Sequence, residues 1–486
     1  MVQERKQSWG EHAVEQQYSQ QSGGLMLEDL EQYGSGSRVL SHEESKTFVR
    51  PVHDLAEPLV PRQQQDVGAE NALYSFPESP ASRAVIFGLI NATAGIPALI
   101  AFATIVFQHP VYSPYLDLLC KFFFASSAVH QAVFNVFSTI PFAMGQVQDV
   151  GIIFMSAMAT SVAELVQHEG GDVETALGSA LFSMTISTII VGLGTLIVAR
   201  KSLAGFVQYI PLPVMGGYLG FVGYFCIASG VGLGSSQEIS SLTSWFSIFN
   251  QDSLIKLVPT LLSCIAMVLT MEHVRHPLGL PSTLIGLVAT FHVVLLVMGV
   301  SLSQAQAAGW VLAPAKGPVK FWELWKLYHF ESWTLSGLYF PAIWRQGAKT
   351  LGLVLVVIFG SCMDIAAVQQ DVPVRIDFNR ELTTVALSNI VTGVAGVGFT
   401  GSYIFSQTIF TMRAGVFNRV NGWVISIAEL LVFVYPYSIV QYIPNYFLGA
   451  LMVWFGFEIS RDWLFLSFYK LTLVGTHIFV CSGTNA

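Results

Sequence analysis

The stretch from residue 379 to 415 reads NRELTTVALSNIVTGVAGVGFTGSYIFSQTIFTMRAG. Its two apolar segments, 383–397 and 401–413, are each too short to cross a bilayer, which takes about 20 helical residues. Glycines separate them, and we expect a new helix to begin at Thr400 or Ser402. Such a helix start presents unpaired N–H groups and a positive dipole end, which suit an anionic or polar ligand. The alternative is that the glycines only let neighbouring helices pack closely.

A matching break lies in the first half of the chain. The polar run from Gly145 to Asp149 precedes the short apolar segment 149–166. Interrupted apolar segments at corresponding places in two halves are typical of the binding site of an inverted-repeat transporter. Irregular backbone persists at membrane depth only where protein or a water-filled cavity surrounds it. The two breaks therefore predict a ligand site.

The composition of the whole chain is that of a membrane protein. Of its 486 residues, 53% are apolar and only 11% are charged, less than half of the quarter that is usual in soluble domains. We predict spans at 85–107, 116–141, 149–166, 174–199, 212–234, 255–271, 279–301, 349–370, 383–397, 401–413, 422–437 and 445–460, and a thirteenth from about 470. The fold class is therefore all-α and polytopic in the membrane.

The same sequence disfavours several other classes of function. The net charge is −8 and no basic stripe is present, so we expect no nucleic-acid partner. No phosphate-binding loop, Ser/His/Asp order or metal-ligand spacing occurs, so we expect no enzyme activity, no cofactor and no metal. The five cysteines lie in or beside apolar runs and are interpreted as small buried hydrophobes.

Residues 1–82 are predicted to form a disordered, acidic and Gln-rich tail in the cytosol. They carry 13 Asp/Glu against 6 Lys/Arg and little apolar surface. With the N-terminus in the cytosol, most loops that carry Lys/Arg are also cytosolic, as the positive-inside rule requires. The long non-cytosolic loop 302–348 disagrees with this rule. Its centre, residues 321–328, is interpreted as an amphipathic, Trp-rich helix in the membrane interface, with a ligand-stacking site as the alternative.

Over about residues 85–480 the sequence resembles the SulP family of anion transporters, named after sulfate permeases. The resemblance rests on Asn-Arg-Glu-Leu from residue 379, the Ser-Asn-Ile segment from 388, the glycine-rich crossover, and Arg-Ala-Gly from 413. The opening span, with Gly95-Ile96-Pro97, is similar to that family's first span.

The resemblance implies a UraA-like fold of seven plus seven spans in inverted repeats. The first repeat would cover 83–301 and the second 349–486. A core domain of spans 1–4 and 8–11 would carry substrate past a gate domain of spans 5–7 and 12–14. The family usually continues into span 14 and a cytosolic STAS domain, so we expect the chain to be C-terminally incomplete, with about 12–13 spans. A homodimer is a further implication.

The resemblance also implies a substrate site between the N-termini of half-helices 3 and 10. Asp149-Val150-Gly151 and Gly401-Ser402-Tyr403 occupy those ends. The implied substrate-binding residues are Pro97, Asp149, Val150, Gly151, Gly401, Ser402, Tyr403, Ser406 and Gln407. Asp364, in the middle of span 8, would flank the site.

Three positions depart from the pattern of this family. Ala98 follows the span 1 proline where many members have Gln, and Gln407 stands near a position that is often basic. Asp149 replaces a small neutral residue at the start of half-helix 3. The site has therefore lost a positive group and gained a carboxylate.

Each buried polar residue allows a functional and a structural interpretation. Asp149 is either a helix N-cap or a substrate or proton site, and the two are compatible. Asp364 is either a proton or cation coupling residue or a neutral, hydrogen-bonded one. Glu429 is expected at a helix interface, and His130 is expected to be packed or interfacial rather than a proton relay.

These observations predict a secondary active transporter that moves an inorganic anion such as sulfate by elevator-type alternating access. One alternative is a proton-coupled transporter of a cationic or zwitterionic solute such as a basic amino acid. Another is a non-transporting membrane motor or scaffold. The expected partners are a small anion or amino acid, protons as a coupling ion, and the lipid bilayer. The organelle is left open by the sequence.

Overall fold

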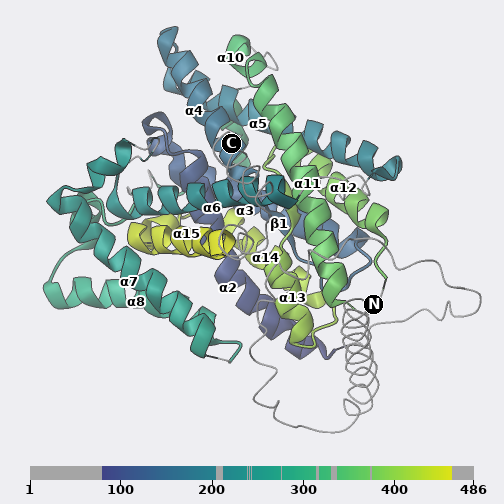
Figure 1. The fold of residues 1–486 in the computed structure, drawn as a ribbon. Helices are drawn as coiled ribbons and strands as arrows, with labels where there is room; N and C mark the ends of the chain where they lie inside the picture. The colour runs from purple at the N-terminus through teal and green to yellow at the C-terminus, as the bar shows by residue number, and fades with distance from the viewer. Residues whose placement is uncertain are drawn as a thin grey trace, which may run out of the picture. The chain divides into compact units, whose positions relative to one another are not determined.

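The computed structural model describes residues 79–461, apart from 204–211, 238, 240, 242, 275, 313–316, 330–336 and 373–374. Within these residues the chain is mainly helical (Figure 1). The predicted thirteenth span and nearly all of the predicted tail lie outside the described residues.

The predicted spans up to residue 460 each correspond to a helix. The first half of the chain contains α2 (Ala81–Val106), α3 (Leu116–Phe137), α4 (Ile152–His168), α5 (Val173–Arg200), α6 (Leu212–Ser235), α7 (Gln251–His273) and α8 (Gly279–Met298). The second half contains α11 (Gly347–Asp371), α12 (Phe378–Val394), α13 (Phe405–Arg413), α14 (Val420–Val434) and α15 (Asn445–Ser460). Among the described helices, α2, α5, α7, α8 and α11 are long and apolar enough to cross a membrane.

The long helix α5 illustrates how these segments are delimited. Asp172 caps its start, because its Oδ1 accepts a hydrogen bond from the Thr175 N–H at 2.8 Å. Hydrogen bonds from Thr175 also lower the pKa of Asp172. The helix ends with Arg200 in its last turn, where a cation interacts favourably with the helix dipole.

A two-stranded antiparallel sheet lies at the two sequence breaks. In it β1 (Gly145–Val147) pairs with β2 (Gly401–Tyr403), and Gln146 lies opposite Ser402. The prediction that a helix begins at Thr400 or Ser402 is therefore wrong, because α13 begins at Phe405. Pairing the two extended segments satisfies backbone groups that would be costly to leave unpaired away from water.

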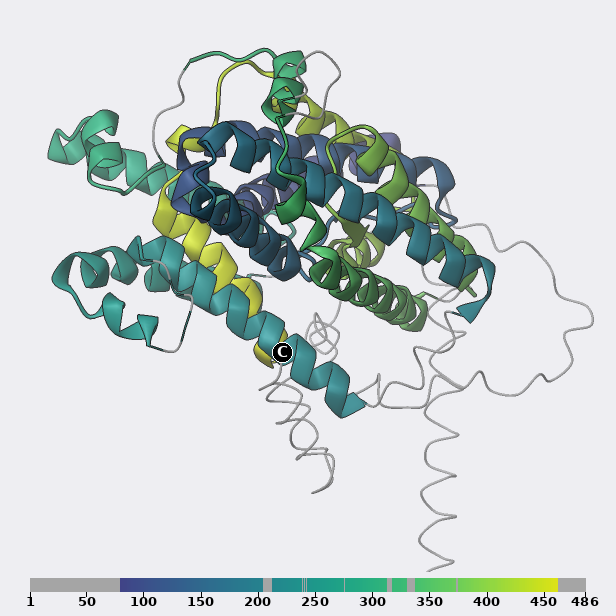
Figure 2. The ribbon, with the colours of Figure 1, turned by 90° about the horizontal axis from the view of Figure 1, so that it is seen from above.

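We name α2 to α5 with α11 to α14 the core set, and α6 to α8 with α15 the gate set; α2 also contacts α8 and α15 of the gate set. In the core set, α5 packs on α12, and α14 packs on α3 and α2. In the gate set, α15 packs on α6 and α7, and α7 also contacts α8. Figure 2 shows the yellow helix α15 running alongside the teal helix α6.

Small residues allow the close contact between α6 and α15. A Cβ atom on Gly230 would lie 2.6 Å from the carbonyl oxygen of Gly449. Gly393 near the end of α12 and Gly398 in the crossover before β2 act in the same way, since added Cβ atoms would lie 2.4 Å from Ile189 and 2.8 Å from Thr185 of α5. The packing role that the sequence offered as an alternative for these glycines is therefore present.

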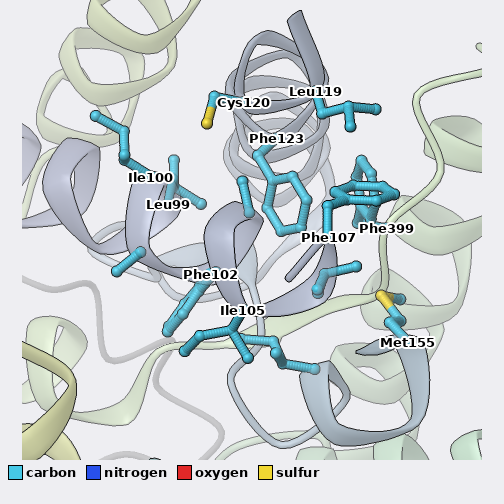
Figure 3. Close-up of a cluster of buried hydrophobic side chains, with 14 of the residues drawn as sticks. Leu99, Ile100, Phe102, Ile105, Phe107, Leu119, Cys120, Phe123, Met155 and Phe399 are labelled. Carbon is cyan, nitrogen blue, oxygen red and sulfur yellow. The ribbon is translucent and has the colours of Figure 1, made fainter. Parts of the chain in front are cut away.

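A large apolar cluster joins α2, α3 and α4 to the crossover that leads into β2 (Figure 3). Phe123 of α3 stacks on Phe399 of the crossover with ring centroids 3.9 Å apart, and Phe107 meets Phe399 edge-on at 6.1 Å. Aromatic pairs of this kind contribute about 1 kcal/mol each beyond the area they bury. They fix the segment immediately before the second strand.

Shorter elements connect the spans: η3 (Pro110–Tyr115), η5 (Ser244–Ile248), α9 (Leu302–Ala307), η6 (Phe321–Tyr328), α10 (Phe340–Trp344) and η8 (Val440–Tyr442). The predicted interfacial helix at 321–328 is the 3₁₀ helix η6, and it packs against protein. Trp325 Nε1 donates to the Ala395 carbonyl at 3.0 Å, and the Tyr328 hydroxyl donates to that of Gly396 at 2.9 Å. Only its outer face is open, where Trp322 is 57% exposed.

Candidate functional site

Two side-chain amides hold the strands at the candidate site. Gln131 of α3 accepts from the Gly145 N–H at 2.9 Å and donates to the Ala143 carbonyl at 3.1 Å. Asn389 of α12 accepts from the Gly401 N–H at 3.0 Å and donates to the Gly401 carbonyl at 2.8 Å. The irregular backbone therefore finds partners within the protein, as apolar surroundings require.

Asp149 lies between β1 and α4, next to Val150. Its Oδ1 accepts from the Val150 N–H at 2.8 Å, so the carboxyl satisfies one backbone donor near the helix start. Val150 packs in a cluster with Val222 and Cys226 of α6. The carboxyl is also close enough to Cys226 for an electrostatic interaction.

Asp364 approaches the same place from α11. Its carboxyl interacts electrostatically with that of Asp149. One turn earlier on α11, the Ser361 hydroxyl is 2.7 Å from the Ser402 hydroxyl of β2. Within the described parts of the chain, no Lys, Arg or His side chain forms an ion pair with either carboxyl. The candidate site therefore contains two acidic side chains, and no described basic side chain forms an ion pair with them.

Two residues that the sequence analysis did not select also belong here. Gln148 is buried, and its Oε1 has no hydrogen-bond partner; neither has the Oγ1 of Thr400. Glycines make room for both, since a Cβ atom on Gly360 would lie 2.7 Å from Gln148 Nε2 and one on Gly151 2.5 Å from Thr400 Oγ1. Their positions within the two sequence breaks were the available signal.

The remaining predicted site residues have different surroundings. Pro97 lies half-buried inside α2, Ser406 is exposed at the start of α13, and Gln407 has an unpartnered, buried Oε1. The Tyr403 hydroxyl is instead bound to Glu381 of α12 and to Ser138. Tyr403 thus joins a buried polar cluster in which Glu381 also accepts from the Thr139 N–H at 2.7 Å.

His130 and Glu429 are both fully buried. The two ring nitrogens of His130 lie 2.9 Å from the Ser388 hydroxyl and 2.9 Å from the Phe399 carbonyl, in keeping with a packed residue. Glu429 of α14 accepts from Gln146 Nε2 of β1 at 2.7 Å and lies close to Ser127 of α3, so it is found where two helices and a strand meet. Over the described residues, no group of three His, Cys, Asp or Glu is arranged to hold a metal ion.

Broken helices that meet at paired strands, with polar groups gathered at the break, are typical of polytopic membrane transporters built from inverted repeats. The chain belongs to the sulfate permease family, whose family model matches residues 83–480. The resemblance predicted from the sequence is thereby confirmed.

Known proteins support the fold. The transmembrane domain of a cyanobacterium bicarbonate transporter, BicA, superposes with a TM-score of 0.59 at 14% identity, covering 83% of this chain and 94% of that one. SLC26A9 gives a TM-score of 0.59 at 16% identity over 83% of this chain and 62% of that one. The inward-facing murine anion transporter Slc26a9 gives 0.57 at 12% identity over 93% and 73%.

One curated relative is similar in sequence. The vacuolar basic amino acid transporter VSB1 of Saccharomyces cerevisiae is 24% identical over 400 residues, which are 80% of this chain and 37% of that protein. The chain therefore spans little more than a third of the length of this relative.

Proposed function

We propose that this protein is a secondary active transporter of a cationic amino acid such as arginine or lysine. The observation that carries the proposal is the pair of interacting carboxyls, Asp149 and Asp364, with which no described basic side chain is paired. Guanidinium and ammonium groups are the ligands that such carboxyls favour. The positively polarised starts of α4 and α13 suit the α-carboxylate of the same solute.

The unpartnered acceptors support this choice. Gln148 Oε1 is buried without a donor, and a substrate with several N–H groups would supply one. The name of the yeast relative, a basic amino acid transporter, agrees with the same substrate class. In this proposal Asp149 binds the cationic group, and Asp364 exchanges a proton as the substrate comes and goes.

An inorganic anion such as sulfate is the second candidate. The two helix starts and the sulfate permease family favour it. The two carboxyls oppose it, because an anion would be repelled by either of them when ionised. For either substrate, we propose that the core set slides past the gate set in an elevator motion, with the N-terminus in the cytosol.

Uptake into liposomes that contain the purified protein tests the proposal. We expect saturable uptake of labelled arginine that unlabelled lysine inhibits and sulfate does not. Saturable sulfate uptake that arginine leaves unchanged would favour the second candidate. If neither solute is transported by protein that elutes as a folded species, the scaffold alternative gains support.

A further inference from the structure

We propose that Glu429, Ser127 and Gln146 form a proton-binding site behind the candidate substrate site. The Glu429 side chain is 0% exposed, and its Oε1 accepts from Gln146 Nε2 at 2.7 Å. Its Oε2 makes no hydrogen bond of normal geometry, and the hydroxyl of Ser127 on α3 lies close to the same carboxyl. A carboxyl oxygen that is fully buried without a paired cation favours the protonated acid over the carboxylate.

The charged groups on the elements around Glu429 are engaged elsewhere. On α3, Lys121 donates to the Tyr435 carbonyl at 2.6 Å, Asp117 interacts with Lys121, and His130 binds Ser388 and Phe399. On α2 the one charged residue is Arg83, whose guanidinium lies near Gly415. Before α14, Arg419 Nη2 donates to the Ser138 carbonyl at 2.7 Å. None of these described groups compensates an ionised Glu429.

The number of ligands favours a proton over a metal cation. Hard metal cations take about six to eight oxygen ligands, whereas a proton needs two oxygens within hydrogen-bond reach. In the neutral state the Oε2–H of Glu429 donates to Ser127 Oγ. When that proton leaves to water, the carboxylate remains and the Ser127 hydroxyl turns to donate to it. The serine hydroxyl serves both states because it can donate or accept.

The site is linked to the candidate substrate site through β1. Gln146 is the middle residue of that strand and lies opposite Ser402. Its amide is confined, because a Cβ atom on Gly95 of α2 would lie 3.2 Å from Gln146 Nε2. An ionised Glu429 would draw donors and water into this packed contact, since a buried charge without a partner is costly. Its protonation therefore sets the position of the strand that leads to Asp149.

Glu429→Gln tests the site, because its amide oxygen can still accept from Gln146 and cannot lose a proton. We expect infrared spectra of the variant to lack one carboxylic-acid C=O band of the wild type. We also expect the pH profile of its maximal arginine transport rate to lose one titration step, while the step that belongs to Asp364 remains, with KM at acidic pH within about twofold of wild type. The infrared measurement needs no substrate, so it stands even if arginine is not transported.

Two outcomes would overturn the proposal: an unchanged set of carboxylic-acid bands, or an unchanged pH profile of the maximal rate. A shift in sodium dependence with no infrared change would identify a cation site instead. Ser127→Ala is the second variant, and it removes a hydroxyl that has no other partner. It should displace the midpoint of the same pH profile, and an unmoved midpoint would likewise contradict the proposal.

Discussion

Asp149 lies where two electrostatic effects oppose each other. The start of α4 carries about half a positive charge from the helix dipole, which attracts anions. An ionised Asp149 carries a full negative charge at the same place, and one backbone N–H, that of Val150, binds its Oδ1. The full charge outweighs the partial one. In the proposed function, the charge of this residue therefore decides the sign of the solute that binds.

Asp149→Asn should weaken arginine binding about a hundredfold. At an effective dielectric of about 20, two unit charges roughly 5 Å apart interact by ~3 kcal/mol, which is about two decades of affinity. The apparent KM for arginine in liposomes measures this change, and sulfate binding, if any, should improve. Asp377→Asn, at the N-cap of α12, is the matched control. If Asp149→Asn has the wild-type KM for both solutes, Asp149 acts only as a helix cap and does not bind substrate.

Asp364→Asn should abolish the coupling of substrate transport to a proton gradient. Asparagine keeps the shape of the side chain and cannot titrate, so the fold should persist. The measurement is arginine accumulation driven by an imposed pH difference, compared with arginine exchange at equal pH. Asp364→Glu retains a titratable group and should restore part of the accumulation. Accumulation at the wild-type level in Asp364→Asn would remove Asp364 from the coupling mechanism.

The acidic residues of the candidate site could be predicted from the sequence because a charge is unusual in an apolar segment. The residues whose role depends on how side chains pack could not. Asp364 stands out because an acid in mid-span is costly, and Asp149 because it interrupts an apolar segment. Gln148 and Thr400 were selected because each has a buried side-chain oxygen without a hydrogen-bond partner, and this can be seen only in the folded structure. Tyr403 follows Ser402 directly, but in a strand neighbouring side chains point to opposite faces, and its hydroxyl binds Glu381.

At the scale of elements, the strand pair depends on long side chains from neighbouring helices. Gln131 of α3 serves β1, and Asn389 of α12 serves β2, each by accepting from one backbone N–H and donating to a carbonyl. The sequence indicated a break at both places. It gave no sign that the breaks pair with each other, because the partners lie more than 250 residues apart. For that reason the helix start was expected at Thr400 or Ser402 and is found at Phe405.

Asn389→Leu should destabilise the protein by roughly 2–6 kcal/mol. The substitution leaves the N–H and the carbonyl of Gly401 buried without their side-chain partner, and each such group costs about 1–3 kcal/mol. Thermal unfolding of the detergent-solubilised protein measures the effect. Asn379→Leu on the same helix is the control, because the side-chain oxygen of Asn379 has no partner to lose. Equal melting temperatures for the two variants would contradict the proposed support of β2.

Over the whole molecule, the helix contacts repeat in the order that inverted repeats require. If α2 to α6 are matched in order with α11 to α15, α5 corresponds to α14 and α3 corresponds to α12. The contact of α5 with α12 then corresponds to the contact of α14 with α3, and both contacts are present. The connecting segment touches both helix sets. Asn445 of α15 donates to the Trp310 carbonyl at 2.8 Å, whereas Trp325 binds the end of α12.

A cross-link between the two sets should stop transport reversibly. Val150 of the core set and Cys226 of the gate set belong to one apolar cluster, so Val150→Cys brings a second thiol beside the native one. Oxidation should abolish arginine uptake in this variant, and a reductant should restore it, because an elevator motion cannot proceed with core and gate joined. Val150→Cys combined with Cys226→Ala is the control and should remain active after oxidation. Full uptake by the cross-linked protein, with the cross-link verified by mass spectrometry, would show that solute passes without relative motion at this contact.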